Sequence, residues 1–120
     1  MTVTTQAPAT TWTDVCPAHL LRVEDGVAVL LPNGAQVALF RTRDHHLYAV
    51  DNIDPRTGAA VISRGIVGDR GGEPTITSPM LKEVYSLRTG TGLDDDTRLT
   101  TWPVRQRGGT VQIAVEGGTP

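Results

Sequence analysis

Short runs in which apolar and polar residues alternate, separated by turn-forming residues, constrain the fold of this chain more than any other feature. No apolar stripe with the period of an amphipathic helix extends over a useful length. Turn signals recur instead, at Gly26, Asn33-Gly34, Pro55, Gly58, Gly71-Gly72, Gly90 and Gly108-Gly109. Because successive side chains of a strand point to opposite faces of a sheet, the pattern predicts an all-β fold.

Two hairpins are predicted. Residues 26–31 (GVAVLL) and 35–40 (AQVALF) flank Pro32-Asn33-Gly34, and Asn-Gly readily adopts the backbone angles of a tight turn. Residues 101–106 (TWPVRQ) and 110–115 (TVQIAV) flank Arg107-Gly108-Gly109, and the alternation in the last run predicts that its valines and isoleucine face the core. Further strands are expected at residues 46–50, 74–77 and 82–87, and a single helical turn at residues 16–21.

A chain of 120 residues is expected to form one domain. Residues 1–11 and 117–120 are poor in apolar groups, so we expect them to be disordered tails around a domain at residues 12–116. Residues 51–74 form an unusually long connection for so small a domain. Its apolar residues, among them Ile62 and Val67, indicate that it packs against the rest of the fold.

Charge and cysteine content narrow the classes of partner. The net charge is −2 and acidic and basic residues are interspersed, which is not the electrostatic pattern of a nucleic-acid or anionic-lipid binder. There is no apolar run long enough to span a membrane and no basic, apolar leader. The single cysteine, Cys16, rules out an internal disulfide and any site with several thiolates. We therefore expect a cytoplasmic protein with no nucleic-acid or membrane partner.

No catalytic, cofactor-binding or metal-ligating residue is predicted from local motifs. His45 and His46 are adjacent, so on a strand they would point to opposite faces. Asp94-Asp95-Asp96 lacks the alternating ligands and closing glutamate of a calcium loop. No nucleophile elbow surrounds any serine, and the glycine-rich residues 64–73 lack the Lys-Ser/Thr of a phosphate-binding loop. A metal or redox role for Asp54, Ser78, Cys16 or a histidine stays open as an alternative.

Three stretches taken together resemble the Rieske ferredoxin fold: YAVDNIDP (48–55), TSPMLKEVYSLRTG (77–90) and TWPVR (101–105). In a Rieske centre, two Cys bind one iron and two His bind the other. At the corresponding positions this chain has Asn52 and Asp54 in the first loop, and Ser78 and Leu81 in the second. The resemblance implies a Rieske-like antiparallel β-sandwich with two loop hairpins, whose cluster site is degenerate and binds no [2Fe–2S] cluster.

The space left by the missing cluster is expected to be filled by apolar side chains. We expect Ile53, Val61, Ile66, Met80 and Leu81 to form a dry plug between the two loops, each contributing about 1.5–3 kcal/mol if buried.

Within Rieske-like proteins, four motifs resemble the small subunits of assimilatory NAD(P)H-dependent nitrite reductases: N-I-D-P (52–55), S-R-G-I-V-G-D (63–69), S-P-M-L-K (78–82) and L-R-T-G (87–90). The resemblance implies an accessory small subunit of the cytoplasmic enzyme that reduces nitrite to ammonium. Its large subunit is expected to carry FAD, siroheme and an iron–sulfur cluster, and this chain to carry no cofactor.

Such a subunit would act by docking to its large partner. The residues expected to contact the large subunit lie in or near the two loops: Asn52, Asp54, Arg64, Asp69, Ser78, Pro79 and Lys82. The alternative is a cluster-free, Rieske-like binding module that serves a different oxidoreductase.

Overall fold

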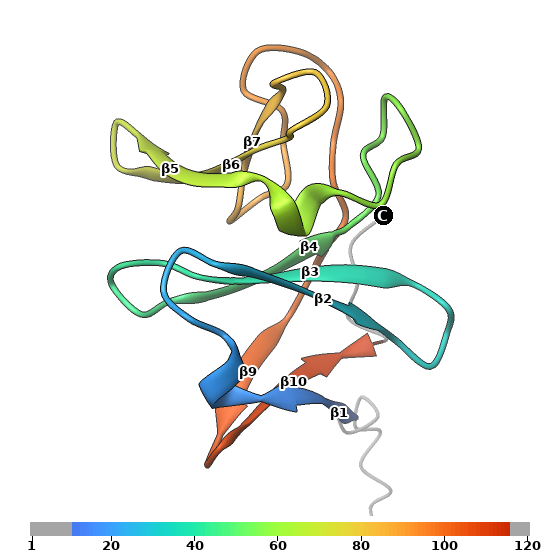
Figure 1. The fold of residues 1–120 in the computed structure, drawn as a ribbon, viewed down its shortest axis with the longest axis vertical. Coiled ribbons are helices and arrows are strands. Elements are labelled where there is room, and N and C mark those ends of the chain that lie inside the picture. The colour runs from blue at the N-terminus through green and yellow to red at the C-terminus, as the bar shows by residue number, and fades with distance from the viewer. Residues whose placement is uncertain (1–10, 116–120) are drawn as a thin grey trace, which may run out of the picture.

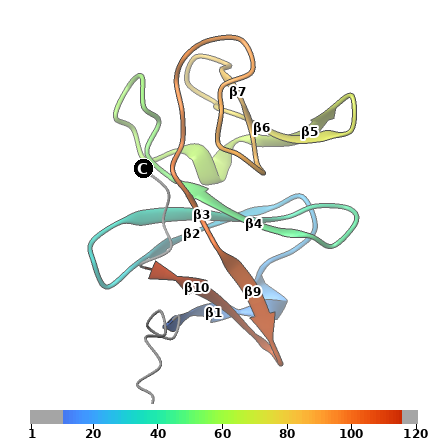
Figure 2. The same cartoon turned by 180° about the vertical axis from the view of Figure 1, so that it is seen from behind.

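Three antiparallel sheets stack along the long axis of the molecule. The computed structural model describes residues 11–115, and the predicted tails fall almost entirely outside them. The sheets contain β1 (Trp12–Pro17), β10 (Thr110–Ala114) and β9 (Val104–Arg107); β2 (Gly26–Leu30), β3 (Gln36–Arg41), β4 (Leu47–Asp51) and β8 (Thr101–Trp102); and β5 (Ile66–Arg70), β6 (Glu73–Thr77) and β7 (Val84–Ser86). Figures 1 and 2 show the four-stranded sheet between the other two. The all-β prediction is confirmed.

The Asn-Gly hairpin forms as predicted. β2 and β3 pair in register from Gly26 opposite Phe40 to Leu30 opposite Gln36. In the turn, the Leu31 N–H donates to the Ala35 carbonyl at 2.8 Å, and Gly34 has a φ of 89°. The hairpin between β9 and β10 is also confirmed, with Arg107 opposite Thr110.

The predicted strand at residues 101–106 divides at Pro103. Before the proline, β8 pairs with β4, and after it β9 pairs with β10 in a different sheet. Proline has no N–H to donate to a ladder, so it suits the point where the chain leaves one sheet for the next. The helical turn expected at residues 16–21 is present as one 3₁₀ turn, η1 (Ala18–Leu20).

The long connection at residues 51–74 contains regular structure that its sequence did not reveal. It includes the 3₁₀ turn η2 (Ile62–Arg64) and the strand β5, which pairs with β6 from Ile66 opposite Thr77 to Arg70 opposite Glu73. β5 is an edge strand, and Val67 is its one partly buried residue. Its sequence therefore shows no alternation of apolar and polar side chains. As expected, the connection packs down, because Ile62 is fully buried.

The central strand β3 supplies both hydrophobic cores. Ala38 and Phe40 belong to the core between the four-stranded sheet and the β5-β6-β7 sheet, whereas Val37 and Leu39 belong to the core on the opposite face. All four are fully buried. Alternate side chains of this one strand therefore pack against both of the neighbouring layers. Val111 and Ile113 of β10 are buried in the second core as predicted, and Val115 is half-buried.

Candidate functional site

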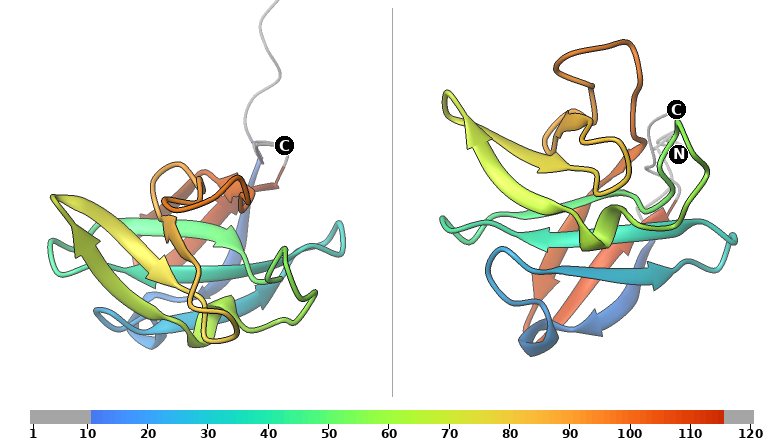
Figure 3. Two further views of the ribbon diagram at one scale, coloured as in Figure 1. Left: turned by 90° about the horizontal axis from the view of Figure 1, so that it is seen from above. Right: turned by 45° about the horizontal axis from the view of Figure 1, so that its top comes forward.

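Two loops meet at the end of the molecule opposite β1, β9 and β10. The first loop comprises residues 52–60 after β4, and the second loop comprises residues 78–83 between β6 and β7 (Figure 3). The first loop is closed by the Asp54 N–H, which donates to the Ala59 carbonyl at 2.8 Å. The second loop is closed by the Ser78 N–H, which donates to the Glu83 carbonyl at 2.8 Å. Each loop is therefore closed by a backbone hydrogen bond of its own, independent of its contact with the other loop.

A buried hydrogen bond between Asp54 and Ser78 joins the two loops. The Ser78 hydroxyl donates to Asp54 Oδ2, and both side chains are fully buried. The other carboxylate oxygen, Oδ1, accepts from the N–H groups of Arg56 at 2.8 Å and Thr57 at 3.3 Å. Buried polar groups are costly unless they are paired, and here every Asp54 oxygen is paired. We call this pair the Asp54–Ser78 link.

Asn52 connects the start of the first loop to η2. Its side-chain oxygen accepts from the Ser63 N–H at 2.8 Å, and its backbone carbonyl oxygen accepts from the Ile62 N–H at 3.1 Å. Immediately after η2, Gly65 lies against the end of β6, because a Cβ placed on it would be 2.4 Å from the Thr77 carbonyl oxygen. η2 therefore holds the first loop through Asn52 and approaches the base of the second through Gly65.

A charged cluster ties both loops to residues 91–98. Arg56 Nε donates to Glu83 Oε1 at 3.1 Å, and the Arg56 guanidinium lies 3.7 Å from Asp95 Oδ2. Hydrogen bonds with Glu83 and Thr97 lower the pKa of Asp95 to about 2. The pKa of Glu83 is raised, chiefly by its hydrogen bond with Asp95. Both carboxyl groups lie beside the same cation, Arg56, which thus connects the first loop to the second loop and to residues 91–98.

The predicted dry plug between the loops is wrong. Met80 is 47% exposed, Leu81 54% and Ile66 69%, while Ile53 and Val61 are only half-buried. The two loops meet instead through the polar Asp54–Ser78 link, which occupies the position where the plug was expected. Because the second loop stands at the end of the fold, the described residues leave about half of the Met80 and Leu81 side chains exposed.

The residues expected to contact a partner divide into two groups. Asn52, Asp54 and Ser78 are buried, and their side chains hold the loops in place. The other four are exposed: Arg64, Asp69, Pro79 and Lys82. Of these, Asp69 lies apart in β5, where its side chain accepts from the Gly72 N–H at 2.8 Å. The partner contacts themselves stay a prediction.

The side chains of the two loops do not fit a Rieske cluster. Such a cluster needs two thiolates and two imidazoles, but Leu81 has no donor atom and the oxygens of Asp54 are already bonded. Cys16 lies on β1, in the sheet farthest from the loops, and burial raises the pKa of its thiol. Across residues 11–115, no group of three or more His, Cys, Asp or Glu side chains could hold a metal ion.

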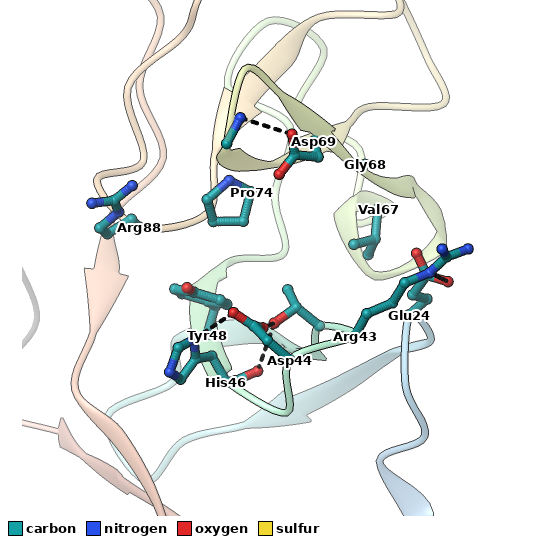
Figure 4. Close-up of a pocket in the computed structure, with 12 residues that line it drawn as sticks. Glu24, Arg43, Asp44, His46, Tyr48, Val67, Gly68, Asp69, Pro74 and Arg88 are labelled. Atoms are coloured by element: carbon teal, nitrogen blue, oxygen red, sulfur yellow. Dashed lines mark hydrogen bonds and ion pairs between the residues drawn. The ribbon is translucent and has the colours of Figure 1, made fainter.

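A separate cleft of about 740 Å³ opens between the turn after β3 and the β5-β6 hairpin (Figure 4). Tyr48, Val67 and Pro74 contribute apolar surface to its lining. Arg43 of the cleft pairs with Glu24 at 3.1 Å, and Arg88 pairs with Glu73 at 2.6 Å. His46 Nδ1 lies 2.9 Å from Asp44 Oδ2, and Asp69 accepts from the Gly72 N–H. Both arginines of the cleft are therefore already paired with carboxylates.

Comparison with known proteins relates the chain to one family. A family model described as "Rieske-like [2Fe-2S] domain" matches residues 11–114. The nitrite reductase (NADH) small subunit of Escherichia coli (strain K12) is 33% identical over 104 residues, which is 85% of this chain and 95% of that protein. A crystallised protein from Mycobacterium tuberculosis, described as an NADH-dependent nitrite reductase small subunit, superposes with a TM-score of 0.83 at 44% identity and covers 92% of this chain and 96% of that chain.

A further relative is much longer than this chain. The nitrite reductase [NAD(P)H] large subunit of Klebsiella oxytoca is 36% identical over 107 residues, which is 88% of this chain but 11% of that protein. A segment similar to this whole domain is therefore part of a large-subunit polypeptide in one organism, while it is a separate small subunit in others.

Proposed function

The chain belongs to the Rieske-like [2Fe-2S] domain family, and from that premise we propose that it is the accessory small subunit of an NAD(P)H-dependent nitrite reductase. The observation that carries the proposal is the similarity of this chain to proteins named as the small subunit of that enzyme. The similarity extends over 95% of the length of those proteins. The reaction is the reduction of nitrite to ammonium in nitrogen assimilation.

Docking to the large subunit is the role that best suits the two loops. The Klebsiella oxytoca relative supports this partner, because a domain joined covalently to a large subunit in one organism is expected to contact it where the two are separate chains. The loops themselves contain no set of side chains suited to a cluster. We propose that the chain carries no cofactor, and that FAD, siroheme and an iron–sulfur cluster reside in the large subunit.

The proposed location is the cytoplasm. A single cysteine with no partner for a disulfide suits a reducing compartment. Within residues 11–115, no helix has the length and apolar content needed to cross a membrane.

Reconstitution with the large subunit tests the proposal. The chain, carrying an affinity tag, is expected to retain the large subunit encoded by the same genome, and its addition to the isolated large subunit is expected to raise the rate of nitrite-dependent NAD(P)H oxidation. A tagged, unrelated β domain of similar size and charge serves as the control. If the large subunit binds the control as well as it binds this chain, or binds neither, the proposed function is wrong.

A further inference from the structure

The second loop exposes two large apolar side chains next to each other. Met80 is 47% exposed and Leu81 54%, and the preceding Pro79 is also exposed. Ile66, at 69% exposure, lies opposite Thr77 at the base of this loop. Exposed apolar residues scattered singly are ordinary, whereas adjacent ones at a loop tip are characteristic of interaction sites.

Hydrogen bonds within the second loop fix the backbone that carries these side chains. The Lys82 N–H donates to the Ser78 carbonyl at 3.2 Å, and the Met80 N–H donates to Ser78 Oγ at 3.3 Å. Lys82 adopts a φ of 63°, in the left-handed region that is unfavourable for a residue with a side chain. Because the Asp54–Ser78 link anchors the loop, docking would require little further ordering, which favours affinity.

Two cations, one in the second loop and one near its base, form no ion pair with the described residues. Arg64 and Lys82 are both exposed, and neither forms a salt bridge within residues 11–115, whereas Arg43, Arg56, Arg70 and Arg88 do. Arg64 precedes Gly65, which lies against the Thr77 carbonyl at the base of the second loop. The second loop and its base therefore combine exposed apolar side chains with two cations that form no salt bridge within residues 11–115. This is the arrangement expected at an interface with an acidic partner surface.

We propose that Met80 and Leu81, flanked by Arg64 and Lys82, form the surface that docks on the large subunit, with the two apolar side chains seated in an apolar recess rimmed by carboxylates. We call this surface the loop-tip patch. The inference rests on the proposed function and specifies its contact surface. Asn52, Asp54 and Ser78 are buried, so the proposed contact surface does not include them. It consists instead of exposed residues that those three hold in position.

Two variants test the apolar and the charged parts separately. The first carries Met80→Ser and Leu81→Ser, and the second carries Arg64→Glu and Lys82→Glu. All four positions are exposed, so thermal unfolding and circular dichroism are expected to match those of the wild type. The matched controls are Leu30→Ser, at a residue that is 71% exposed at the end of β2, and Arg107→Glu, at an exposed cation in the sheet farthest from the loops.

The dissociation constant for the complete large subunit is measured by titration calorimetry. The apolar variant is expected to weaken binding by about tenfold or more, as for truncation of central interface residues. The charge-reversed variant is expected to weaken it by a similar factor, and its binding is expected to depend less on salt concentration. Both controls should stay within about twofold of the wild type.

The outcomes separate this inference from the proposed function. If the wild type binds and either loop-tip variant stays within about twofold of it, the large subunit uses another surface and the inference is wrong, while the proposed function stands. If the wild type itself does not bind the large subunit, the proposed function fails and the inference fails with it.

Discussion

Replacing Asp54 with alanine is expected to lower the free energy of unfolding by about 3–5 kcal/mol. The change removes the acceptor for the buried Ser78 hydroxyl and for the backbone N–H groups of Arg56 and Thr57. A buried donor left without an acceptor destabilises the fold by the full free energy of its desolvation. In addition, hydrogen bonds to a carboxylate are stronger than those between neutral groups. Urea-induced unfolding, followed by circular dichroism, measures the loss.

Asp54→Asn is the matched control for this prediction. Asparagine keeps an oxygen that can accept from the two backbone N–H groups, and its amide can donate to Ser78 Oγ, so the expected loss is about 1 kcal/mol. Ser78→Ala should fall between the two, because it removes the link but leaves the backbone bonds to Asp54 intact. A stability of Asp54→Ala within about 1 kcal/mol of the wild type would show that the link does not hold the loops together.

Gly90→Ala is expected to cost about 3–5 kcal/mol, or to prevent folding. Gly90 has a φ of 78°, which is unfavourable for alanine. In addition, a Cβ at this position would lie 2.0 Å from the Leu99 carbonyl oxygen. That carbonyl cannot move freely, since the Leu99 N–H donates to the Gly90 carbonyl at 2.8 Å and Leu99 is buried in the core. The yield of folded protein and urea-induced unfolding measure the effect.

Gly58→Ala separates the two causes. Gly58 has nearly the same φ, 76°, but no atom lies within 4 Å of a Cβ placed on it. The expected cost is therefore only that of the backbone conformation, about 1–2 kcal/mol. If the two variants are equally stable, the contact with Leu99 is not a constraint on this part of the fold.

The hairpins could be predicted from the sequence because their signals are local. Asn33-Gly34 specifies its turn through its own backbone preferences, and the alternation of Val111 and Ile113 reflects the single buried face of β10. β5 could not be predicted in the same way, because an edge strand pairs through its backbone while most of its side chains remain exposed. Its pairing with β6 is fixed by tertiary structure, for which Gly68 and Asp69 give no local signal.

The motifs predicted the position of the two loops but not what joins them. Counting apolar residues favoured a plug that included Met80 and Leu81, yet these side chains are exposed. The plug prediction took no account of hydrogen bonds between the polar residues at the positions where the Rieske resemblance expects cluster ligands. Asp54 and Ser78 in fact bond to each other across the loops. A carboxylate and a hydroxyl at two ligand positions that face one another were the available signal, because such residues can replace a metal bridge by a hydrogen bond.

Three sets of polar contacts hold the two loops in place. The Asp54–Ser78 link, Asn52 and the cluster of Arg56, Glu83 and Asp95 fix the backbone at this end of the molecule. The side chains that remain exposed are those suited to bind a protein surface. In the proposed function, this fixed frame presents the exposed side chains of the second loop to the large subunit.

The iron and acid-labile sulfide content of the purified protein tests most directly whether protein hydrogen bonds alone close the two loops. The protein is produced anaerobically with excess iron, so that a cluster would be incorporated and preserved. We predict far less than one iron per chain and no visible absorbance. About two irons and two sulfides per chain, as a [2Fe–2S] cluster requires, would contradict the account, in which the Asp54–Ser78 link joins the loops and no side chains there suit a cluster.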